Sequence, residues 1–238
     1  ESEGSFEYGN YQREADDLRS VIQYFSERNH AITTILGHSK GGSVVLLYAS
    51  KYHDVPTIIN VAGSYDPKKG IAERLGKDFM EVIKRDGFID VVSKKGQFRV
   101  TEESLMERLS TDMHAACLSI EKGCRVLTVH GSSDEFISVE DAFAFAKIIP
   151  NHKLHIIEGA DHEFSKHQAE LAEVVLNFIK TFIQEGKDFE PLDGASFSQD
   201  ETDFLQNIMS DSNTEDNNAA VPPYDETHCQ PAAFDGIW

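Results

Sequence analysis

Residues 31–49 of this 238-residue chain read AITTILGHSKGGSVVLLYA, and this stretch decides the fold. Residues 32–36 form a short apolar run rich in β-branched side chains, which predicts a strand covered on both faces. Residues 44–49 are continuously apolar, which predicts a buried helix rather than one washed by solvent. The stretch therefore predicts a buried strand and a buried helix, joined by a short glycine-flanked turn that carries Ser39.

The turn matches the pattern G-x-S-x-G at residues 37–41. In that pattern the glycines leave room for a sharp strand-to-helix turn, the nucleophile elbow, which holds the serine at the top of a sheet. The alternative is an ordinary glycine-rich turn, but the predicted strand before it and helix after it favour the elbow. Ser39 is therefore a candidate nucleophile. The backbone N–H of Lys40, at a helix N-terminus, is the natural first donor to an oxyanion, whereas its ammonium is expected to be a solvated charge.

A serine hydroxyl is a weak nucleophile at neutral pH, so it needs a base and a carboxylate that orients the base. The predicted strand at 125–130 is followed by Asp134, and the predicted strand at 154–157 is followed by His162. Because the carboxyl ends of parallel strands meet at one edge of a sheet, both groups are expected beside the elbow. The sequence therefore predicts a catalytic triad of Ser39, Asp134 and His162.

Alternatives remain open around these positions. Glu135 could orient the base in place of Asp134, although Asp134 is nearer the end of its strand. His38 could line the site or merely pack. Three other acids follow the predicted strand at 154–157 and are expected to be surface or loop acids: Glu158, Asp161 and Glu163. No cysteine or histidine pattern has the spacing of a metal site, so no metal is predicted.

The rest of residues 1–187 alternates between predicted helices and strands. A helix before the elbow strand is predicted from apolar residues at helical spacing: Ala15, Leu18, Val21, Ile22 and Phe25. The other predicted elements are strands at 57–62, 125–130 and 154–157, a helix at 139–149, and a last amphipathic helix that carries Leu171, Val174, Val175, Phe178 and Phe182. This alternation predicts an α/β fold with a parallel sheet and helices on both faces.

Residues 65–116 interrupt the alternation with charges of both signs and several glycines. We expect a helix at 71–85, a hairpin around residues 94–96 and a helix at 102–119, together forming an inserted cap. Candidates for a substrate-pocket wall are its large apolar side chains, which could equally pack inside the cap: Phe79, Met80, Phe88, Ile89 and Phe98.

Charge and composition exclude several classes of protein. The net charge is −19, but twelve of the 41 acidic residues and none of the basic ones follow Lys187. Residues 188–238 are therefore predicted to be an acidic, disordered tail, and no basic face for nucleic acid is expected. No apolar run is long enough for a membrane span. The odd number of cysteines, Cys117, Cys124 and Cys229, suggests free thiols and a cytoplasmic protein.

Three motifs in order, GHSKGG at 37–42, HGSSD at 130–134 and GADHEF at 159–164, resemble the α/β-hydrolase superfamily. The resemblance is to serine-aminopeptidase-like (S33-type) and lysophospholipase-like esterases of plants and their bacterial cinnamoyl-esterase relatives. It spans residues 1 to about 186. It implies an α/β-hydrolase fold that lacks the family's first strands, so that the strand at 32–36 becomes an open edge.

The resemblance also implies the chemistry. We expect hydrolysis of a small carboxylic ester through an acyl-enzyme on Ser39, with no cofactor, and with His38, Phe88 and Phe98 contacting the substrate. Two rivals remain: peptide or thioester hydrolysis by the same machinery, and a catalytically inactive binding module of the same fold.

Overall fold

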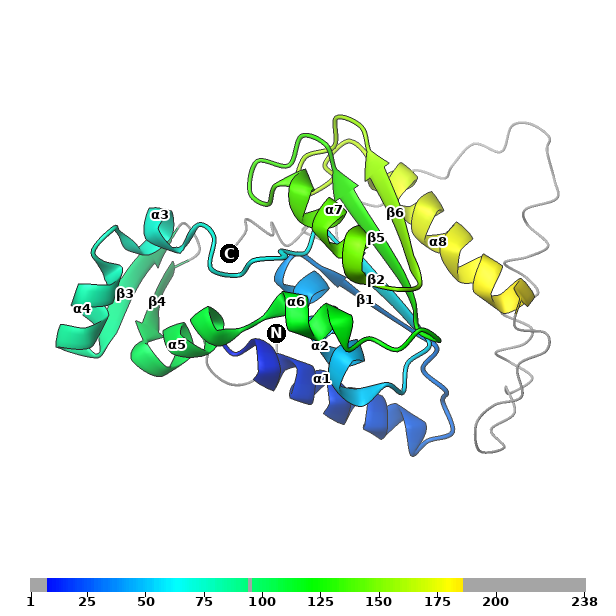
Figure 1. The fold of residues 1–238 in the computed structure, drawn as a ribbon, viewed down its shortest axis with the longest axis horizontal. Helices are drawn as coiled ribbons and strands as arrows, with labels where there is room; N and C mark the ends of the chain where they lie inside the picture. Colours follow the sequence, from blue (N-terminus) through cyan, green and yellow to red (C-terminus); the bar gives the residue numbers. More distant parts are fainter. Residues whose placement is uncertain (1–7, 94–95, 186–238) are drawn as a thin grey trace, which may run out of the picture. The chain divides into compact units, whose positions relative to one another are not determined.

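The computed structural model describes residues 8–93 and 96–185 (Figure 1). Its main sheet has four parallel strands: β1 (Thr34–His38), β2 (Thr57–Val61), β5 (Arg125–Gly131) and β6 (His152–Ile157), in the order β1-β2-β5-β6. The predicted parallel α/β architecture is confirmed. The acidic tail, residues 94–95 of the expected hairpin turn, Cys229 and the first seven residues lie outside the described part of the chain.

Helices cover both faces of the sheet, as predicted. One face packs against α1 (Tyr11–Ser26), α2 (Lys40–Tyr52), α6 (Met113–Leu118) and α7 (Val139–Ile148), and the other against α8 (Gln168–Glu185). Neighbouring residues of a strand point to opposite faces, so Ile58 and Val126 belong to the first core and Ile59 and Leu127 to the second. The helix α2 lies deepest, because every residue from Gly42 to Ala49 is buried.

The elbow strand differs from its prediction. It runs from Thr34 to His38, two residues later than expected, and Leu36 is 51% exposed. Leu36 is paired in register with Ile59, which is buried under α8, but β1 is an edge strand of the described sheet and that cover does not reach it. The expectation of a strand covered on both faces is therefore wrong for β1.

The helix before the elbow is confirmed as α1, but its predicted apolar stripe is too wide. Tyr11, Ala15 and Ile22 are buried, whereas Val21 and Phe25 are 51% and 41% exposed. Val21 and Phe25 are four residues apart and share a flank that turns away from α2. Phe25 instead packs edge-on against Tyr24, with the ring centroids 5.5 Å apart.

Residues 71–110 form a separate group of elements with an apolar cluster of its own. The elements are α3 (Ile71–Leu75), α4 (Phe79–Asp86), the antiparallel strands β3 (Phe88–Ser93) and β4 (Gly96–Thr101), and α5 (Glu102–Ser110). Their cluster is built on Ile71, Ile83, Val100 and Leu105, and Tyr8 joins it. The antiparallel pair agrees with the expected hairpin.

Both long helices predicted in this region are broken. The helix expected at 71–85 stops at Gly76, whose φ of 97° is open to glycine and unfavourable for other residues, and resumes at Phe79. The helix expected at 102–119 stops at Thr111, which is extended, and Asp112 then caps α6 by accepting the Ala115 N–H at 3.0 Å. Each break follows from a residue that favours a helix end over a helix interior.

Candidate active site

Ser39 lies between β1 and α2 in a strained backbone conformation. Its φ of 57° and ψ of −117° are uncommon for a residue with a side chain, and such strain collects at functional sites. The Ser39 N–H donates to the Val61 carbonyl oxygen at 2.7 Å, and the Ser39 carbonyl oxygen accepts the Ser43 N–H at 3.2 Å. These two hydrogen bonds hold the turn to β2 on one side and to α2 on the other. They thereby fix the direction of the Ser39 hydroxyl.

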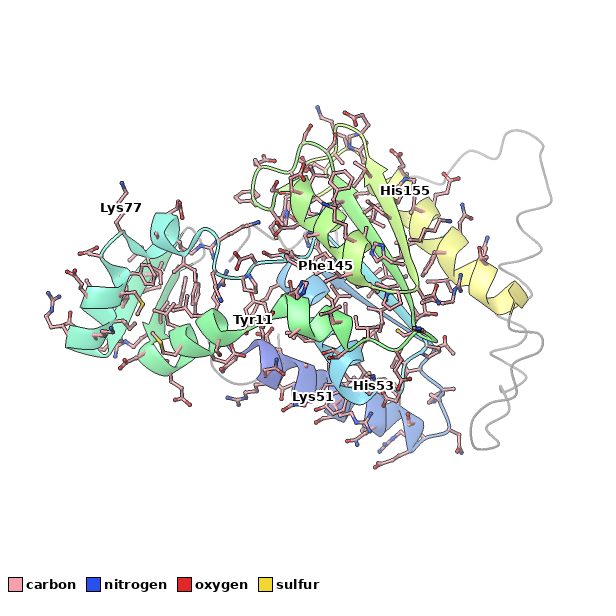
Figure 2. All side chains as sticks on the ribbon, in the orientation of Figure 1. Tyr11, Lys51, His53, Lys77, Phe145 and His155 are labelled. Carbon is pink, nitrogen blue, oxygen red and sulfur yellow. The ribbon has the colours of Figure 1, made fainter. Side chains whose placement is uncertain are left out.

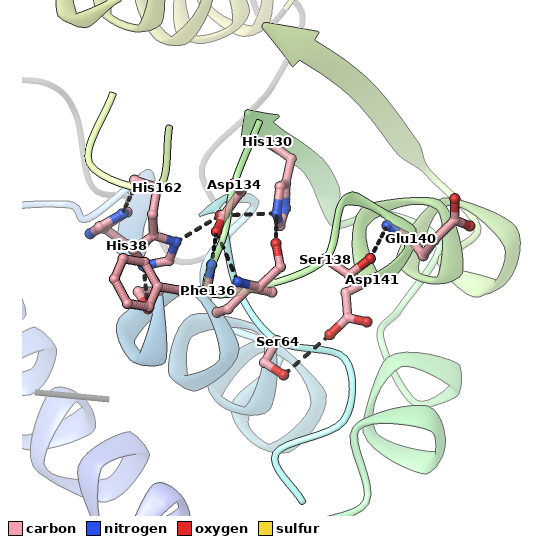
Figure 3. A network of polar contacts seen from close by, with 12 residues as sticks. His38, Ser64, His130, Asp134, Phe136, Ser138, Glu140, Asp141 and His162 are labelled. Carbon is pink, nitrogen blue, oxygen red and sulfur yellow. Dashed lines mark hydrogen bonds and ion pairs between the residues drawn. The ribbon is translucent and has the colours of Figure 1, made fainter. Parts of the chain in front are cut away.

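The three side chains predicted as a triad lie in one line of contacts. Figure 3 shows the His162 ring and the Asp134 carboxylate joined by a dashed line. Ser39 Oγ is 3.1 Å from His162 Nε2, and His162 Nδ1 is 2.7 Å from Asp134 Oδ2. Ser39, His162 and the Asp134 side chain are essentially inaccessible to solvent, at 0%, 1% and 0% exposure. The arrangement can move the hydroxyl proton to the imidazole while the carboxylate holds the ring in place.

The Asp134 carboxylate is held in its ionised form. Its Oδ1 accepts the backbone N–H groups of Phe136 at 2.9 Å and Ile137 at 2.8 Å. Burial acts to raise the pKa of Asp134, but hydrogen bonds from His130, His162 and the Ile137 N–H outweigh it and place the pKa well below its usual range. The carboxylate therefore carries its charge at neutral pH, as an orienting partner for His162 must.

His130 is the group beside the triad that sequence reasoning missed. It is fully buried, and its Nε2 lies 2.9 Å from the Ile137 carbonyl oxygen and 3.2 Å from Asp134 Oδ2. A carbonyl oxygen only accepts, so Nε2 carries the ring proton, while Nδ1 is buried with no partner among the described residues. His130 thus fastens the turn that presents Asp134. The only sequence signal was a polar residue at the end of a buried strand.

We expect His130→Phe to lower kcat roughly 5- to 30-fold, the equivalent of about 1–2 kcal/mol, because the turn that holds Asp134 loses its N–H anchor. His130→Gln places an amide N–H near the position of Nε2, so it should restore most of the loss. The measurement is kcat per active site, with the active sites counted by titration of the reactive serine with a fluorophosphonate. Misfolded protein is then not counted. An unchanged kcat per titrated site in His130→Phe would contradict this role.

Aromatic side chains surround His162. The His38 Nε2 lies 2.9 Å from the His162 carbonyl oxygen, and the two rings are 4.9 Å apart. Burial lowers the pKa of His38 and so favours its neutral ring. Phe136 stands edge-on to the His162 ring, with the ring centroids 5.5 Å apart, and is 62% exposed, so it presents an apolar ring to solvent beside the triad. Phe136 lies outside the three motifs and had no sequence signal of its own.

Other predicted site residues lie as follows. Glu135, the alternative to Asp134, is exposed. The Lys40 ammonium is not a solvated charge, because it pairs with Glu14 Oε1 at 2.5 Å and its side chain is 17% exposed; that expectation is wrong. Phe98 stacks on Tyr8 within the cluster of residues 71–110, and Phe88 packs under the Arg99 guanidinium. Their contact with a substrate stays a prediction.

Among the described residues no group of three or more His, Cys, Asp or Glu side chains could hold a metal ion. None of the helices in residues 8–93 and 96–185 combines the length and the apolar character needed to cross a bilayer. Both described cysteines, Cys117 and Cys124, are free thiols, and burial raises their pKa values to about 12 and about 11.

The architecture and the elbow together define the α/β-hydrolase fold, and solved structures of that fold match this chain. Est1E from Butyrivibrio proteoclasticus is 19% identical with a TM-score of 0.56, and the match covers 73% of this chain and 71% of that one. The α/β hydrolase GrgF from Penicillium sp. sh18 is 18% identical with a TM-score of 0.60, covering 77% and 74%. A monoacylglycerol lipase from Paleococcus ferrophilus is 14% identical with a TM-score of 0.57, covering 74% and 77%. No protein-family model matches the sequence, and no curated protein matches it at a significant level.

Proposed function

We propose that this protein is a serine hydrolase that cleaves carboxylic esters through an acyl-enzyme. One observation carries the proposal: Ser39 Oγ lies within hydrogen-bond distance of His162 Nε2, and His162 Nδ1 within that of the ionised Asp134. A strained, buried serine with a base and an orienting carboxylate in line is the arrangement that acyl transfer requires.

In the first half of the reaction Ser39 Oγ attacks the ester carbonyl carbon and His162 Nε2 takes the hydroxyl proton. The electron pair of the carbonyl moves to its oxygen, to which we expect the Lys40 N–H, at the start of α2, to donate a hydrogen bond. The tetrahedral intermediate then collapses, the bond to the alcohol oxygen breaks, and the leaving alcohol takes the proton from His162. Ser39 is left acylated.

In the second half a water molecule replaces the alcohol. His162 takes a proton from the water, whose oxygen attacks the acyl carbon, and the second collapse returns the proton to Ser39 Oγ as the acid leaves. Asp134 keeps its charge throughout and stabilises the imidazolium that forms twice in each cycle. Neither half requires a cofactor.

Two further observations support an ester as substrate and a place within the superfamily. One of the proteins of similar fold is named as a monoacylglycerol lipase, and a monoacylglycerol is a carboxylic ester. The motifs at 37–42, 130–134 and 159–164 resemble the S33-type and lysophospholipase-like esterases. We further propose that residues 65–116 act as the cap that selects the acyl group, because they leave the sheet directly after β2.

The test is labelling and turnover of the 238-residue chain. A fluorophosphonate probe is expected to modify Ser39 alone, as read by mass spectrometry of the tryptic peptides, and p-nitrophenyl butyrate to be hydrolysed. Ser39→Ala should abolish both, while Ser133→Ala, an exposed serine in the Asp134 loop, should change neither. Absence of label and turnover in the unmodified chain would overturn the proposal, and equal turnover of aminoacyl p-nitroanilides would assign the site to peptides.

A further inference from the structure

Two arginines of the segment 71–110, the half-buried Arg74 and the buried Arg108, have no carboxylate partner among the described residues. Arg108 is 8% exposed, and its Nε donates to the Pro67 carbonyl oxygen at 2.8 Å. Arg74 Nη1 is buried with no hydrogen-bond acceptor among the described residues. Neither forms an ion pair with a described residue, whereas Arg99 on the same segment is paired with Asp90 at 2.8 Å. Burying a charge is costly unless it is paired and hydrogen-bonded, so these two guanidinium groups lack an anion.

The two arginines share their surroundings. The guanidinium carbon of Arg108 lies 4.7 Å from the ring centroid of Tyr8 and 5.7 Å from that of Tyr11. Burial lowers the pKa of Arg74, and the nearby charge of Arg108 lowers it further, while Tyr8 and Tyr11 act in the opposite direction. Tyr8 is 2% exposed and its hydroxyl has no partner among the described residues. Two donors in this neighbourhood, Arg74 Nη1 and the Tyr8 hydroxyl, are therefore buried without a partner among the described residues, and Arg108 uses only its Nε.

The nearby carboxylates form no ion pair with Arg74 or Arg108 among the described residues. Glu107 accepts the Gln12 N–H at 3.0 Å through Oε1, and its Oε2 is buried without a hydrogen bond to either arginine. Glu14 is paired with Lys40 at 2.5 Å. The charge of Glu107 is close enough to act on Tyr11, yet it forms no ion pair with the two guanidinium groups. Apart from Arg108 Nε, which donates to Pro67, no N–H of either guanidinium group donates to a described residue, and the contact of Arg108 with the Tyr8 ring does not use its in-plane N–H groups.

Tyr11 connects this cluster with the side chain of Lys40. Tyr11 stands at the start of α1, where α1 meets α5 (Figure 2). The Lys40 ammonium lies 5.1 Å from the Tyr11 ring centroid, and Arg108 lies 5.7 Å from the same centroid. Lys40 follows Ser39 directly in the chain. The Tyr11 ring thus contacts both the Arg108 guanidinium and the ammonium of Lys40, the residue after the nucleophile.

We propose that Arg74, Arg108 and the Tyr8 hydroxyl bind an oxyanion, a carboxylate or a phosphate, and that this group is the charged end of the ester that Ser39 cleaves. The second part rests on the proposed function; the binding of the anion does not. Two guanidinium forks match the planar oxygens of a carboxylate and the tetrahedral oxygens of a phosphate, and such charge-assisted bonds are about twice as strong as neutral ones. The preferred substrate is therefore an ester with a negative charge remote from the scissile bond.

Anion binding is tested without turnover, on the Ser39→Ala chain. Sodium glutarate and inorganic phosphate are titrated by calorimetry and by thermal shift, and the tighter of the two identifies the kind of oxyanion. Arg74→Gln and Arg108→Gln should each weaken binding at least tenfold, whereas Arg99→Gln, which removes an arginine already paired with Asp90, should leave it unchanged. Because Arg108 also holds the Pro67 carbonyl, the more exposed Arg74 is the decisive variant. Absence of binding, or equal binding in Arg74→Gln and Arg99→Gln, would overturn the proposal.

Turnover then tests whether the bound anion is part of the ester substrate. We expect p-nitrophenyl hydrogen esters of dicarboxylic acids, from glutarate to suberate, to exceed their neutral methyl esters at least tenfold in kcat/KM at one chain length, and Arg74→Gln to abolish that preference. Turnover of p-nitrophenyl acetate reports on the hydrolase function alone. If the acetate is hydrolysed without any preference for charged esters, the substrate proposal fails and the hydrolase stands; if anions bind but no ester is hydrolysed, the hydrolase fails and the anion site stands.

Discussion

Gly37→Ala is expected to leave little or no folded protein. A Cβ added at Gly37 would lie 2.1 Å from the Gly41 carbonyl oxygen and 2.3 Å from the Gly41 carbonyl carbon. Both obstacles are backbone atoms of the elbow, so no side chain can rotate away. Relief would require β1 and α2 to separate, and α2 is the most deeply buried helix of the chain. We expect a loss of about 4 kcal/mol or more in the free energy of unfolding, at the upper end for a single substitution.

Gly41→Ala is the matched control, because the same methyl group is added four residues later. At Gly41 the added Cβ would meet nothing within 4 Å, so we expect a change in stability within about 0.5 kcal/mol. Urea unfolding followed by circular dichroism measures both variants. Equal stability of Gly37→Ala and the unmodified chain would show that the elbow is looser than its contacts indicate. The pattern G-x-S-x-G thus contains one glycine that sterics require and one that they do not.

The sheet could be predicted from the sequence because β2, β5 and the helix α2 are buried, and buried elements have continuous apolar runs in their sequence. The elbow could be predicted because the strand before it and the helix after it are both recognisable in the sequence. The breaks at Gly76 and Asp112 were missed because apolar residues recur at helical spacing on both sides of each break. A helix end depends on single residues, and periodicity over ten or more residues does not detect it.

Contacts between segments that are far apart in the sequence could not be predicted either. Lys40 lies in the motif that the sequence analysis examined most closely, but its partner Glu14 is 26 residues earlier and on another helix. Likewise the sequence shows His130 at the end of a strand without showing that it meets the Ile137 carbonyl oxygen. Arg74 and Arg108 lie on helices that only the fold brings together. A sequence pattern supplies residue types in order, whereas pairing and the absence of pairing depend on the packing of separate elements.

Asp134→Asn is expected to lower kcat by about 10⁴ while leaving the fold intact. An asparagine oxygen can still accept the N–H groups of Phe136 and Ile137, so the turn should keep its shape. The amide nitrogen would then face His162 Nδ1 in place of Asp134 Oδ2, and it can only donate. It would force the imidazole proton onto Nε2, which faces Ser39 Oγ and could then no longer accept the serine proton.

The matched control is Glu135→Gln, which removes the neighbouring exposed carboxylate that could have served in place of Asp134. The kcat of this variant should stay within twofold of that of the unmodified chain. Turnover of p-nitrophenyl butyrate and the melting temperature are measured for both variants. A loss below tenfold in Asp134→Asn, or a comparable loss in Glu135→Gln, would contradict the proposed role of Asp134 as the group that orients His162.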